Sequence, residues 1–276
     1  MSLLPSLLSL PVVVSRLRAA GCVFAEEEAE LLLSTARTPA DLAGMVERRA
    51  EGLPLEHVLG WAEFCGTRMA VDPGVFVPRR RTEFLVHRAV ALARGALPAR
   101  PDRPALPRVV VDLCCGSGAV GAALVAALDD IELYAVDIDP AAVRCARRNV
   151  GDGGRVYEGD LYEPLPAVLR GRVDLLVANA PYVPTEAIGS LPAEARVHEP
   201  LVALDGGEDG VEVQRRVTAG APLWLAPDGH LLVETSERQA PRTVAAFARN
   251  GLEAKVARSE ELDATVVIGR RGPGGR

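Results

Sequence analysis

Residues 109–121 read VVVDLCCGSGAVG, an apolar β-branched run that passes into glycines and then into an alanine-rich stretch. β-Branched residues favour a strand, and alanine favours a helix. Gly116, Gly118 and Gly121 fit the pattern G-x-G-x-x-G, which lets the backbone turn tightly and approach a ligand at the N-terminus of the following helix. The stretch therefore predicts a strand–turn–helix unit that binds a nucleoside cofactor. The glycines alone are also compatible with a purely structural turn.

Acidic residues near the glycines narrow the choice of cofactor. A second apolar run, residues 131–136, ends at Asp137, roughly 20 residues after the glycines, where a carboxylate can bind the ribose hydroxyls. Asp112 precedes the glycines and suits the ammonium of an amino-acid tail better than a pyrophosphate. Asp160 follows a short third strand and can accept a hydrogen bond from an adenine amino group. The set favours S-adenosylmethionine over a dinucleotide.

A second decisive stretch, residues 176–182, reads LVANAPY and ends an apolar strand on a proline–aromatic turn. The side-chain oxygen of Asn179 can accept a hydrogen bond from an NH2 group. Ala180 precedes Pro181, which holds it extended with its carbonyl in a restricted direction, so it offers a second acceptor. Tyr182 supplies a flat face for an amide or a base. Although such a turn is often only structural, its combination with the cofactor signals predicts methyl transfer to a planar nitrogen.

The order of elements predicts a doubly wound α/β sheet. The predicted elements are a strand–helix–strand–helix run over residues 108–149 and further strands over residues 155–157, 173–178 and 230–234. In such sheets ligands bind at the carboxyl ends of the strands. Asp112, Asp137, Asp160 and Asn179 all fall at or just beyond such ends. We therefore expect one cleft to hold all four.

The N-terminal part predicts a small helical domain. Residues 3–14 form an apolar run, but Arg16 and Arg18 follow it, whereas a secretory signal has its basic residues first, and the run is too short to span a bilayer. We interpret it as a first helix. Further helices are predicted over residues 24–36, 39–51 with Thr38 as N-cap, and 82–94 with Thr82 as N-cap, and a proline-rich linker over residues 97–107.

Composition limits the function classes. A chain of 276 residues with 49% hydrophobic content can bury an α/β core plus a small accessory domain. The net charge of -6 argues against a large nucleic-acid footprint. The five cysteines have no paired spacing, which makes a disulfide framework or a metal site improbable. We expect a cytoplasmic, monomeric enzyme without a membrane segment.

Further motifs appear in a fixed order along the chain. Residues 54–60 read PLEHVLG, residues 71–79 read VDPGVFVPR, and a later block over residues 199–210 begins with Glu199-Pro200. Together with the glycine turn and the Asn179 turn, these motifs resemble those of the HemK-type protein glutamine methyltransferases, over about residues 50 to 240. Members of that family methylate the side-chain amide nitrogen of glutamine in peptide chain release factors.

The resemblance implies a fold and a site. The fold is a seven-stranded Rossmann-like methyltransferase sheet over residues 81–276, preceded by a helical substrate-recognition domain over residues 1–58 and a connecting β-hairpin over residues 59–80. The implied catalytic residues are Asn179, Ala180, Pro181 and Tyr182. The implied S-adenosylmethionine-binding residues are Asp112, Cys114, Gly116, Gly118, Asp137, Ile138, Asp160, Leu161 and Asn179.

The chain departs from the family pattern at four places, and these bear on the protein substrate more than on the cofactor. Ala180 replaces the second residue of Asn-Pro-Pro-Tyr, Arg80 and Arg81 replace Pro-Glu, Ser236 replaces a glycine, and the last strand lacks the usual Asp-x-x-Gly-x-x-Arg ending. Two other functions therefore stay open. One is methylation of an exocyclic base amine in DNA or RNA, since the same turn can hold a flipped base. The other is cofactor binding without catalysis, serving only protein interaction.

Overall fold

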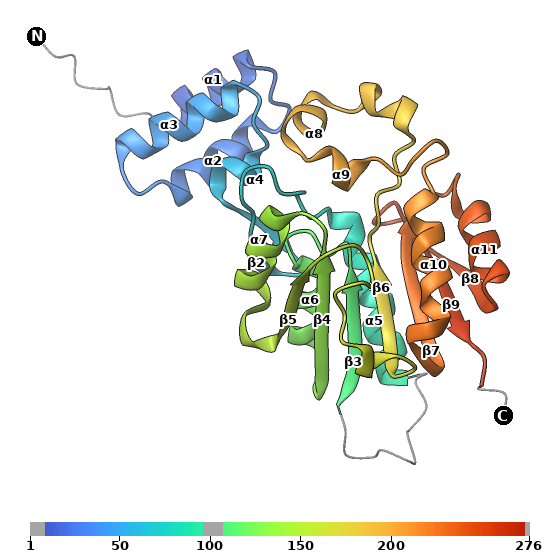
Figure 1. Cartoon of the computed structure of the whole chain (residues 1–276). Helices are drawn as coiled ribbons and strands as arrows, with labels where there is room; N and C mark the ends of the chain where they lie inside the picture. The colour runs from blue at the N-terminus through green and yellow to red at the C-terminus, as the bar shows by residue number, and fades with distance from the viewer. Residues whose placement is uncertain (1–8, 96–106, 274–276) are drawn as a thin grey trace, which may run out of the picture.

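A seven-stranded sheet forms the centre of the computed structural model, which describes residues 9–95 and 107–273 (Figure 1). The strand order is β5-β4-β3-β6-β7-β9-β8. The strands are β3 (Arg108–Leu113), β4 (Ile131–Asp137), β5 (Gly154–Glu158), β6 (Val173–Ala178), β7 (Leu225–Thr235), β8 (Leu252–Ser259) and β9 (Ala264–Arg271). β3 to β7 run parallel, and β9 is antiparallel to both β7 and β8. The doubly wound Rossmann-like fold is thereby confirmed.

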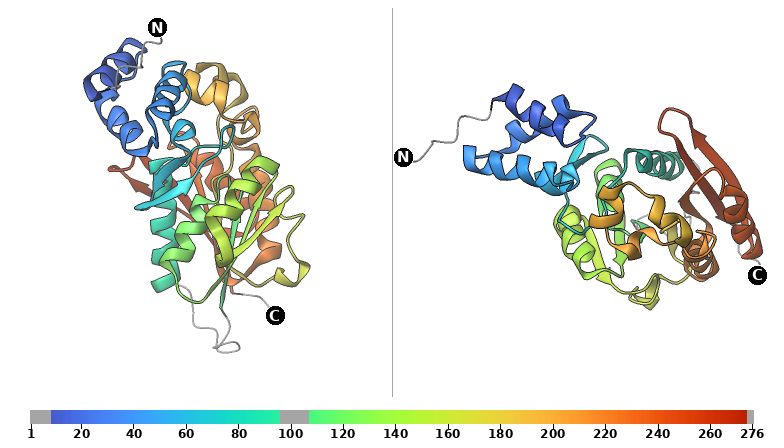
Figure 2. Two further views of the ribbon diagram at one scale, coloured as in Figure 1. Left: turned by 90° about the vertical axis from the view of Figure 1, so that its left-hand side faces the viewer. Right: turned by 90° about the horizontal axis from the view of Figure 1, so that it is seen from above.

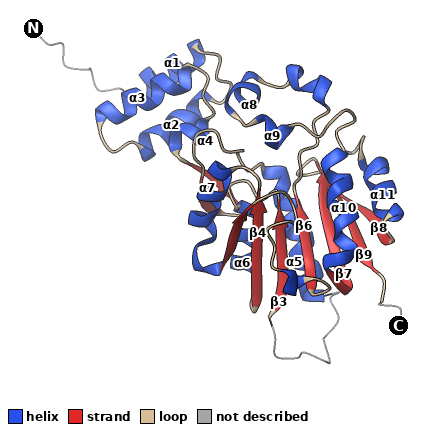
Figure 3. Ribbon diagram, in the orientation of Figure 1, coloured by secondary structure: helices blue, strands red, loops and turns tan. Residues whose placement is uncertain are grey.

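Helices cover both faces of this sheet (Figure 3). They are α5 (Glu83–Gly95), α6 (Ala119–Ala127), α7 (Pro140–Val150), α10 (Glu212–Trp224) and α11 (Ala240–Arg249). Because side chains alternate along a strand, Val109 and Val111 of β3 share a buried cluster with α10 and α11, whereas Val110 packs with α5 and α6. Strands buried on both faces explain the continuous apolar runs in the sequence.

Four short helices before the sheet form a separate apolar cluster (Figure 1). They are α1 (Leu10–Ala19), α2 (Ala25–Thr35), α3 (Pro39–Ala50) and α4 (Leu55–Leu59). The predicted cap of α3 is confirmed, because the Thr38 hydroxyl accepts a hydrogen bond from the Asp41 N–H at 3.1 Å. α1 begins later than the predicted helix over residues 3–14, of which residues 3–8 lie outside the described part of the chain. Most of the predicted linker, residues 97–106, also lies outside it.

A β-hairpin connects these helices to the sheet. β1 (Trp61–Phe64) and β2 (Thr67–Ala70) pair antiparallel. The Asn149 side chain fixes the hairpin, because its Oδ1 accepts from the Ala70 N–H and its Nδ2 donates to the carbonyls of Ala70 and Ser117, each at 2.8 Å. One asparagine of α7 thus ties the hairpin to the glycine turn.

An insertion between β6 and α10 lies above the carboxyl ends of the strands and carries α8 (Ala193–His198) and α9 (Leu201–Leu204) (Figure 1). Arg49 of α3 reaches it. The guanidinium is buried, pairs with Glu28 at 2.6 Å and donates to Glu194 of α8 at 2.6 Å. The N-terminal helices therefore contact the insertion through an ion-pair network in which Arg49 and Glu28 are buried and Glu194 is exposed.

The two ends of the described chain lie far apart. Seen from above, the N-terminal helices and the β8–β9 pair are at opposite ends of the molecule (Figure 2). Within residues 9–95 and 107–273, no helix combines the length and apolarity needed to cross a bilayer.

Candidate active site

A cavity of about 560 Å³ opens at the carboxyl ends of the parallel strands. Its walls come from the glycine turn, the ends of β4 and β6, the segment after the hairpin and the α8–α9 insertion. The predicted site residues that line it are Asp112, Cys114, Gly116, Asp137, Ile138, Asp160, Leu161, Asn179, Ala180, Pro181 and Tyr182. Gly118 does not line it. A cavity of this size suits a drug-sized ligand.

The glycine turn approaches the cavity with its backbone exposed. Gly116 has φ 54°, and a Cβ added there would meet no atom within 4 Å, so its backbone borders open space in the cavity. Gly118 has φ 78° and is the N-cap of α6. A Cβ there would lie 2.9 Å from Cα and Cβ of Ala146, so this glycine lets α6 pack closely against α7. Gly116 thus faces the cavity, and Gly118 serves packing.

Two carboxylates hold the glycine turn in place. Asp112 is 1% exposed, and its Oδ2 accepts from the Gly121 N–H at 2.9 Å. Asp137 accepts from the Gly116 N–H at 2.8 Å through Oδ2 and from the Asp139 N–H at 2.9 Å through Oδ1. Each carboxylate oxygen has further lone pairs for a ligand. Both side chains therefore shape the loop as well as the cavity wall.

Burial also changes the acidity of these two carboxyls. Desolvation raises the pKa of Asp112 to about 7, while the Gly121 N–H acts in the opposite direction. Desolvation likewise raises the pKa of Asp137, against the N–H groups of Asp139 and Gly116. A nearby positive charge would favour the ionised form of both. The site is therefore suited to a cationic ligand.

The remaining predicted cofactor contacts lie beyond β4 and β5. Asp160 pairs with Arg216 of α10 at 2.5 Å. Leu161 has φ 48°, an uncommon backbone conformation for a leucine. Ile138 lines the cavity and is 51% exposed, so an apolar side chain is available to cover the face of a base. In the described segments, no group of three or more His, Cys, Asp or Glu side chains is arranged to hold a metal ion.

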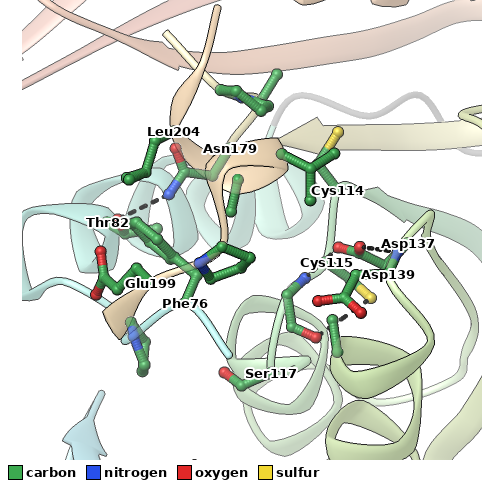
Figure 4. Close-up of a pocket in the computed structure, with 18 of the residues that line it drawn as sticks. Phe76, Thr82, Cys114, Cys115, Ser117, Asp137, Asp139, Asn179, Glu199 and Leu204 are labelled. Atoms are coloured by element: carbon green, nitrogen blue, oxygen red, sulfur yellow. Dashed lines mark hydrogen bonds between the residues drawn. The ribbon is translucent and has the colours of Figure 1, made fainter. Parts of the chain in front are cut away.

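Asn179 is oriented by a residue far away in sequence. Its Nδ2 donates to the Thr82 hydroxyl at 3.3 Å, as the dashed line in Figure 4 shows. Thr82 closes the 3₁₀ turn Arg80–Thr82 before α5 and is 2% exposed. Since the NH2 group is engaged, the side-chain oxygen is left for a ligand. Ala180 follows with no exposed surface, and no donor to its carbonyl is found in the described part of the chain.

Tyr182 is held at both ends. Its carbonyl accepts from Gln239 Nε2 at 2.7 Å, and its hydroxyl lies 3.4 Å from Glu234 Oε1. Burial raises the pKa of Tyr182 to about 12, helped by the charge of Glu234. The ring was predicted as a flat surface for the substrate. It lines the cavity, but much of the residue is buried and both polar ends are engaged.

Glu199 forms the opposite wall. Both of its oxygens accept from Arg79 Nη2 at 2.6 Å, and Oε1 also accepts from the Val77 N–H at 3.3 Å. Burial raises the pKa of Glu199, while Arg79 lowers it. Figure 4 shows Glu199, Thr82 and Asn179 on one side of the pocket and Asp137 on the other. After the ligands predicted from the sequence, we call the side with Asp137 and the glycine turn the nucleoside-facing side, and the side with Asn179, Thr82 and Glu199 the amide-facing side.

Several residues that complete this site were not predicted from the sequence. They are Thr82, Arg216, Glu234 and Gln239. The sequence predicts Thr82 only as a helix cap. No local pattern marks them, because each acts on a partner at least 52 residues away in the chain. Only the folded structure reveals these contacts.

Comparison with known proteins agrees with this geometry. Residues 95–207 match the family described as the methyltransferase small domain. A release factor glutamine methyltransferase of Geobacter sulfurreducens is 39% identical over 219 residues, which cover 77% of this chain and 72% of the relative. The chain belongs to the release factor glutamine methyltransferase family. Methyltransferases of this family depend on S-adenosylmethionine.

Two further relatives define how far the similarity reaches. A 4-amino-L-phenylalanine/4-methylamino-L-phenylalanine methyltransferase of Streptomyces pristinaespiralis is 37% identical, over 75% of this chain and 69% of the relative. A crystal structure of a methyltransferase from Pyrococcus furiosus has a TM-score of 0.53 at 13% identity, covering 84% of this chain and 99% of that chain. The latter shows a shared fold only.

The residues present fit the adenosyl group of S-adenosylmethionine. Gly116 leaves backbone space that a side chain would fill, Ile138 offers an exposed apolar surface, and Asp137 ends β4 with lone pairs to spare. These three features lie on one side of the same cavity. The release factor glutamine methyltransferase fold thus presents a site of suitable size, polarity and backbone access.

Proposed function

We propose that the protein transfers a methyl group from S-adenosylmethionine to the side-chain amide nitrogen of a glutamine in a peptide chain release factor. One observation carries the proposal: Asn179, with its NH2 group engaged by Thr82, lines the same cavity as the glycine turn. The names of the curated relatives support the choice of substrate.

The cofactor is assigned to the nucleoside-facing side. When bound, it supplies a methyl group activated on a positively charged sulfur. Asp137 binds the ribose hydroxyls, Asp160 the adenine amino group, and Asp112 favours the positively charged amino-acid end. The other proposed contacts are Cys114, Gly116, Ile138, Leu161 and Asn179, while Gly118 contributes by setting the position of α6.

The substrate amide is a poor nucleophile because its nitrogen lone pair is delocalised into the carbonyl. The Asn179 side-chain oxygen and the Ala180 carbonyl accept its two hydrogens, hold the nitrogen and direct its lone pair into the cavity. Positioning of this kind lowers a barrier by up to about 7–11 kcal/mol. The two acceptors also stabilise the positive charge that develops on the nitrogen. The alkylated nitrogen then loses one proton to these oxygens or to water.

The other residues of the turn, Pro181 and Tyr182, keep these acceptors in place. Pro181 restricts the backbone of Ala180. Tyr182 closes the turn against the segment that contains Glu234 and Gln239. The catalytic group is therefore the whole turn, of which two oxygens contact the substrate.

We assign recognition of the protein substrate to the helical domain, residues 1–58, and to the hairpin segment, residues 59–80. Arg49 connects these helices to α8 beside the cavity, so binding on the helices is transmitted to the amide-facing side. The enzyme is proposed to act as a cytoplasmic monomer without stable nucleic-acid binding, in keeping with its net charge of -6.

A second candidate substrate is a free amino acid with an aryl amine. Arg81 favours it, because this arginine lines the cavity and has no ion pair within residues 9–95 and 107–273, whereas Arg79 and Arg216 are paired. A substrate carboxylate would match that charge. The relative from Streptomyces pristinaespiralis is named for such a substrate.

Isotope-labelled S-adenosylmethionine separates the two candidates. The protein is incubated in parallel with a release factor, with 4-amino-L-phenylalanine and with a cell extract, and the labelled position is located by mass spectrometry. We expect label on one glutamine amide of the release factor. Label only on the free amino acid would assign the second candidate, and label on nucleic acid would reject both.

A further inference from the structure

The catalytic turn depends on a segment that contributes no residue to the cavity wall. Residues 234–239 cover the end of β7 and lead into α11. Gln239 Nε2 donates to the Tyr182 carbonyl at 2.7 Å and to the Asp209 carbonyl at 3.3 Å. Gln239 is 7% exposed. A buried amide that bridges two backbone carbonyls fixes the distance between the turn and the insertion.

Ser236 determines which way this amide points. Its hydroxyl donates to Gln239 Oε1 at 2.5 Å, and its oxygen lies 3.3 Å from the Gln239 N–H. Because the amide oxygen is engaged by a donor, the NH2 group faces the two carbonyls. Rotating the amide by 180° would place its oxygen against the Tyr182 carbonyl. Ser236 therefore selects the orientation that holds the turn.

Close packing leaves this amide little freedom. A Cβ added to Gly210 would lie 2.2 Å from Gln239 Nε2 and 2.5 Å from the Tyr182 carbonyl oxygen. The contact of the Tyr182 hydroxyl with Glu234 is longer, at 3.4 Å. The bond from Gln239 is thus the shorter of the two that hold Tyr182.

The alanine at position 180 makes the restraint that Gln239 places on the turn important. Alanine lacks the ring that fixes φ in proline, so the Asn179–Tyr182 turn has one soft dihedral angle more than a turn with two prolines. The turn's geometry must then be set by contacts. The hydroxyl of Ser236, at a position where a glycine would offer none, supplies such a contact through Gln239.

We propose that Ser236 and Gln239 form a latch that positions the Asn179–Tyr182 turn for methyl transfer and offsets the flexibility of Ala180. Both are positioning residues, since neither lines the cavity. The inference rests on the proposed function of the turn. It assigns a role to two residues whose distance from Asn179 along the chain hides the connection.

The first test replaces Gln239 with glutamate. A carboxylate cannot donate to the Tyr182 carbonyl and repels it, so we expect kcat to fall by about 10- to 100-fold. The Kd for S-adenosylmethionine, measured by calorimetry, should stay within about threefold. A kcat within twofold of the natural enzyme would overturn the latch.

Thr243→Val is the matched control. The Thr243 hydroxyl lies in the same buried polar cluster, where it contacts Gln214 at 2.7 Å and the Gln239 carbonyl at 3.2 Å, but it does not touch Tyr182. We expect this variant to lower Tm and to leave kcat within twofold. An equal loss of kcat in both variants would show that general destabilisation, and not positioning, is responsible.

A double-mutant cycle tests the connection with position 180. Ser236→Gly should lower kcat several-fold in the natural chain and much less when combined with Ala180→Pro, because the added ring restrains the same turn. Ser236→Thr, which keeps a hydroxyl, should retain activity. Identical effects of Ser236→Gly in both backgrounds would refute the compensation.

Hydrogen exchange separates the latch from the choice of substrate. In Gln239→Glu, the peptide that contains Tyr182 and Val183 should exchange faster, while it should be unchanged in Thr243→Val. This measurement needs no substrate. If hydrogen exchange of this peptide is unchanged in Gln239→Glu, the proposed latch is refuted even if the enzyme methylates a release factor. Faster exchange supports it even if the methylated substrate proves to be a different amine.

Discussion

The two sides of the cavity are constructed differently. On the nucleoside-facing side, carboxylates bind nearby backbone N–H groups: Asp112 contacts Gly121 nine residues away, and Asp137 contacts Gly116. On the amide-facing side, side chains bridge distant segments, as Thr82 does to Asn179 across 97 residues. The contacts of Asp112 and Asp137 belong to the strand–turn–helix units around the glycine turn, whereas Thr82 and Asn179 come together only in the folded protein. Two of the residues that depart from the family pattern, Ala180 and Arg81, line the cavity next in sequence to Asn179 and Thr82.

The largest expected effect comes from Asn179→Ala. Loss of one of the two oxygens that hold the substrate amide should reduce kcat by about 10²–10³-fold. The Kd for S-adenosylmethionine should change by only a few-fold, because the nucleoside-facing contacts remain. Single-turnover kinetics and calorimetry measure both quantities, with Asn250→Ala at the C-cap of α11 as a matched control. Retained turnover would show that Asn179 does not hold the substrate amide, and the assignment of the amide-facing side would then be wrong.

The second prediction compares two buried carboxyls, one on each side. Burial raises the pKa of both Asp112 and Glu234 to about 7 from their ordinary values of 3.8 and 4.5. A carboxyl with a raised folded-state pKa binds its proton more tightly in the folded protein. The protonated carboxyl therefore contributes its full stabilisation at a pH below its unfolded-state pKa. This stabilisation is lost as the pH rises from about 4.5 to 7.

Glu234→Gln should remove that loss. We expect the variant to match the natural protein at pH 4.5 and to exceed its free energy of unfolding at pH 8 by up to about 3 kcal/mol. Asp112→Asn should act in the same direction, but it alone should also weaken cofactor binding. Urea unfolding at several pH values provides the measurement. A pH-independent difference for Glu234→Gln would show that this carboxyl is ionised throughout.

The third prediction concerns Asp137 on the nucleoside-facing side. Asp137→Ala removes charge-assisted hydrogen bonds, so cofactor binding should weaken by about 1.5–3 kcal/mol. Asp152→Ala, which removes an exposed carboxylate after α7, controls for net charge. Calorimetry with S-adenosylmethionine decides. An unchanged Kd for Asp137→Ala would contradict the ribose assignment.

The smallest expected effect separates two neighbouring glycines. Gly116→Ala meets open space but has φ 54°, so its cost to stability should be about 1–2 kcal/mol, accompanied by weaker cofactor binding. Gly118→Ala carries a similar backbone cost and also collides with Ala146, so it should lower Tm further. Equal Tm values for the two variants would remove the distinction between a ligand-facing and a packing glycine.

The same contrast explains what could be predicted from the sequence. The glycine turn and the Asn179 turn were recognised because each lies within one short stretch, and Asp137 because its spacing of roughly 20 residues from the glycines is typical of a ribose-binding acid. Strand and helix periodicity gave the parallel part of the sheet. The antiparallel strands β8 and β9 were expected only from the family resemblance. Contacts such as Asp160 with Arg216 depend on how α10, packed against β6 and β7, lies relative to the loop after β5, which no local pattern encodes.

One contact in the fold has a consequence for how the enzyme can be shortened. Arg49 neutralises Glu194, which lines the cavity, and is itself buried between Glu28 and the α8 insertion. Deleting the N-terminal helices would leave Glu194 uncompensated at the entrance. A truncated enzyme would then repel anionic surfaces of an incoming protein and would lose binding partners through charge as well as through missing area. A variant that lacks the N-terminal helices, and with them Arg49, should therefore also carry a neutral residue in place of Glu194. The loss of binding area can then be measured separately from the effect of the unpaired charge.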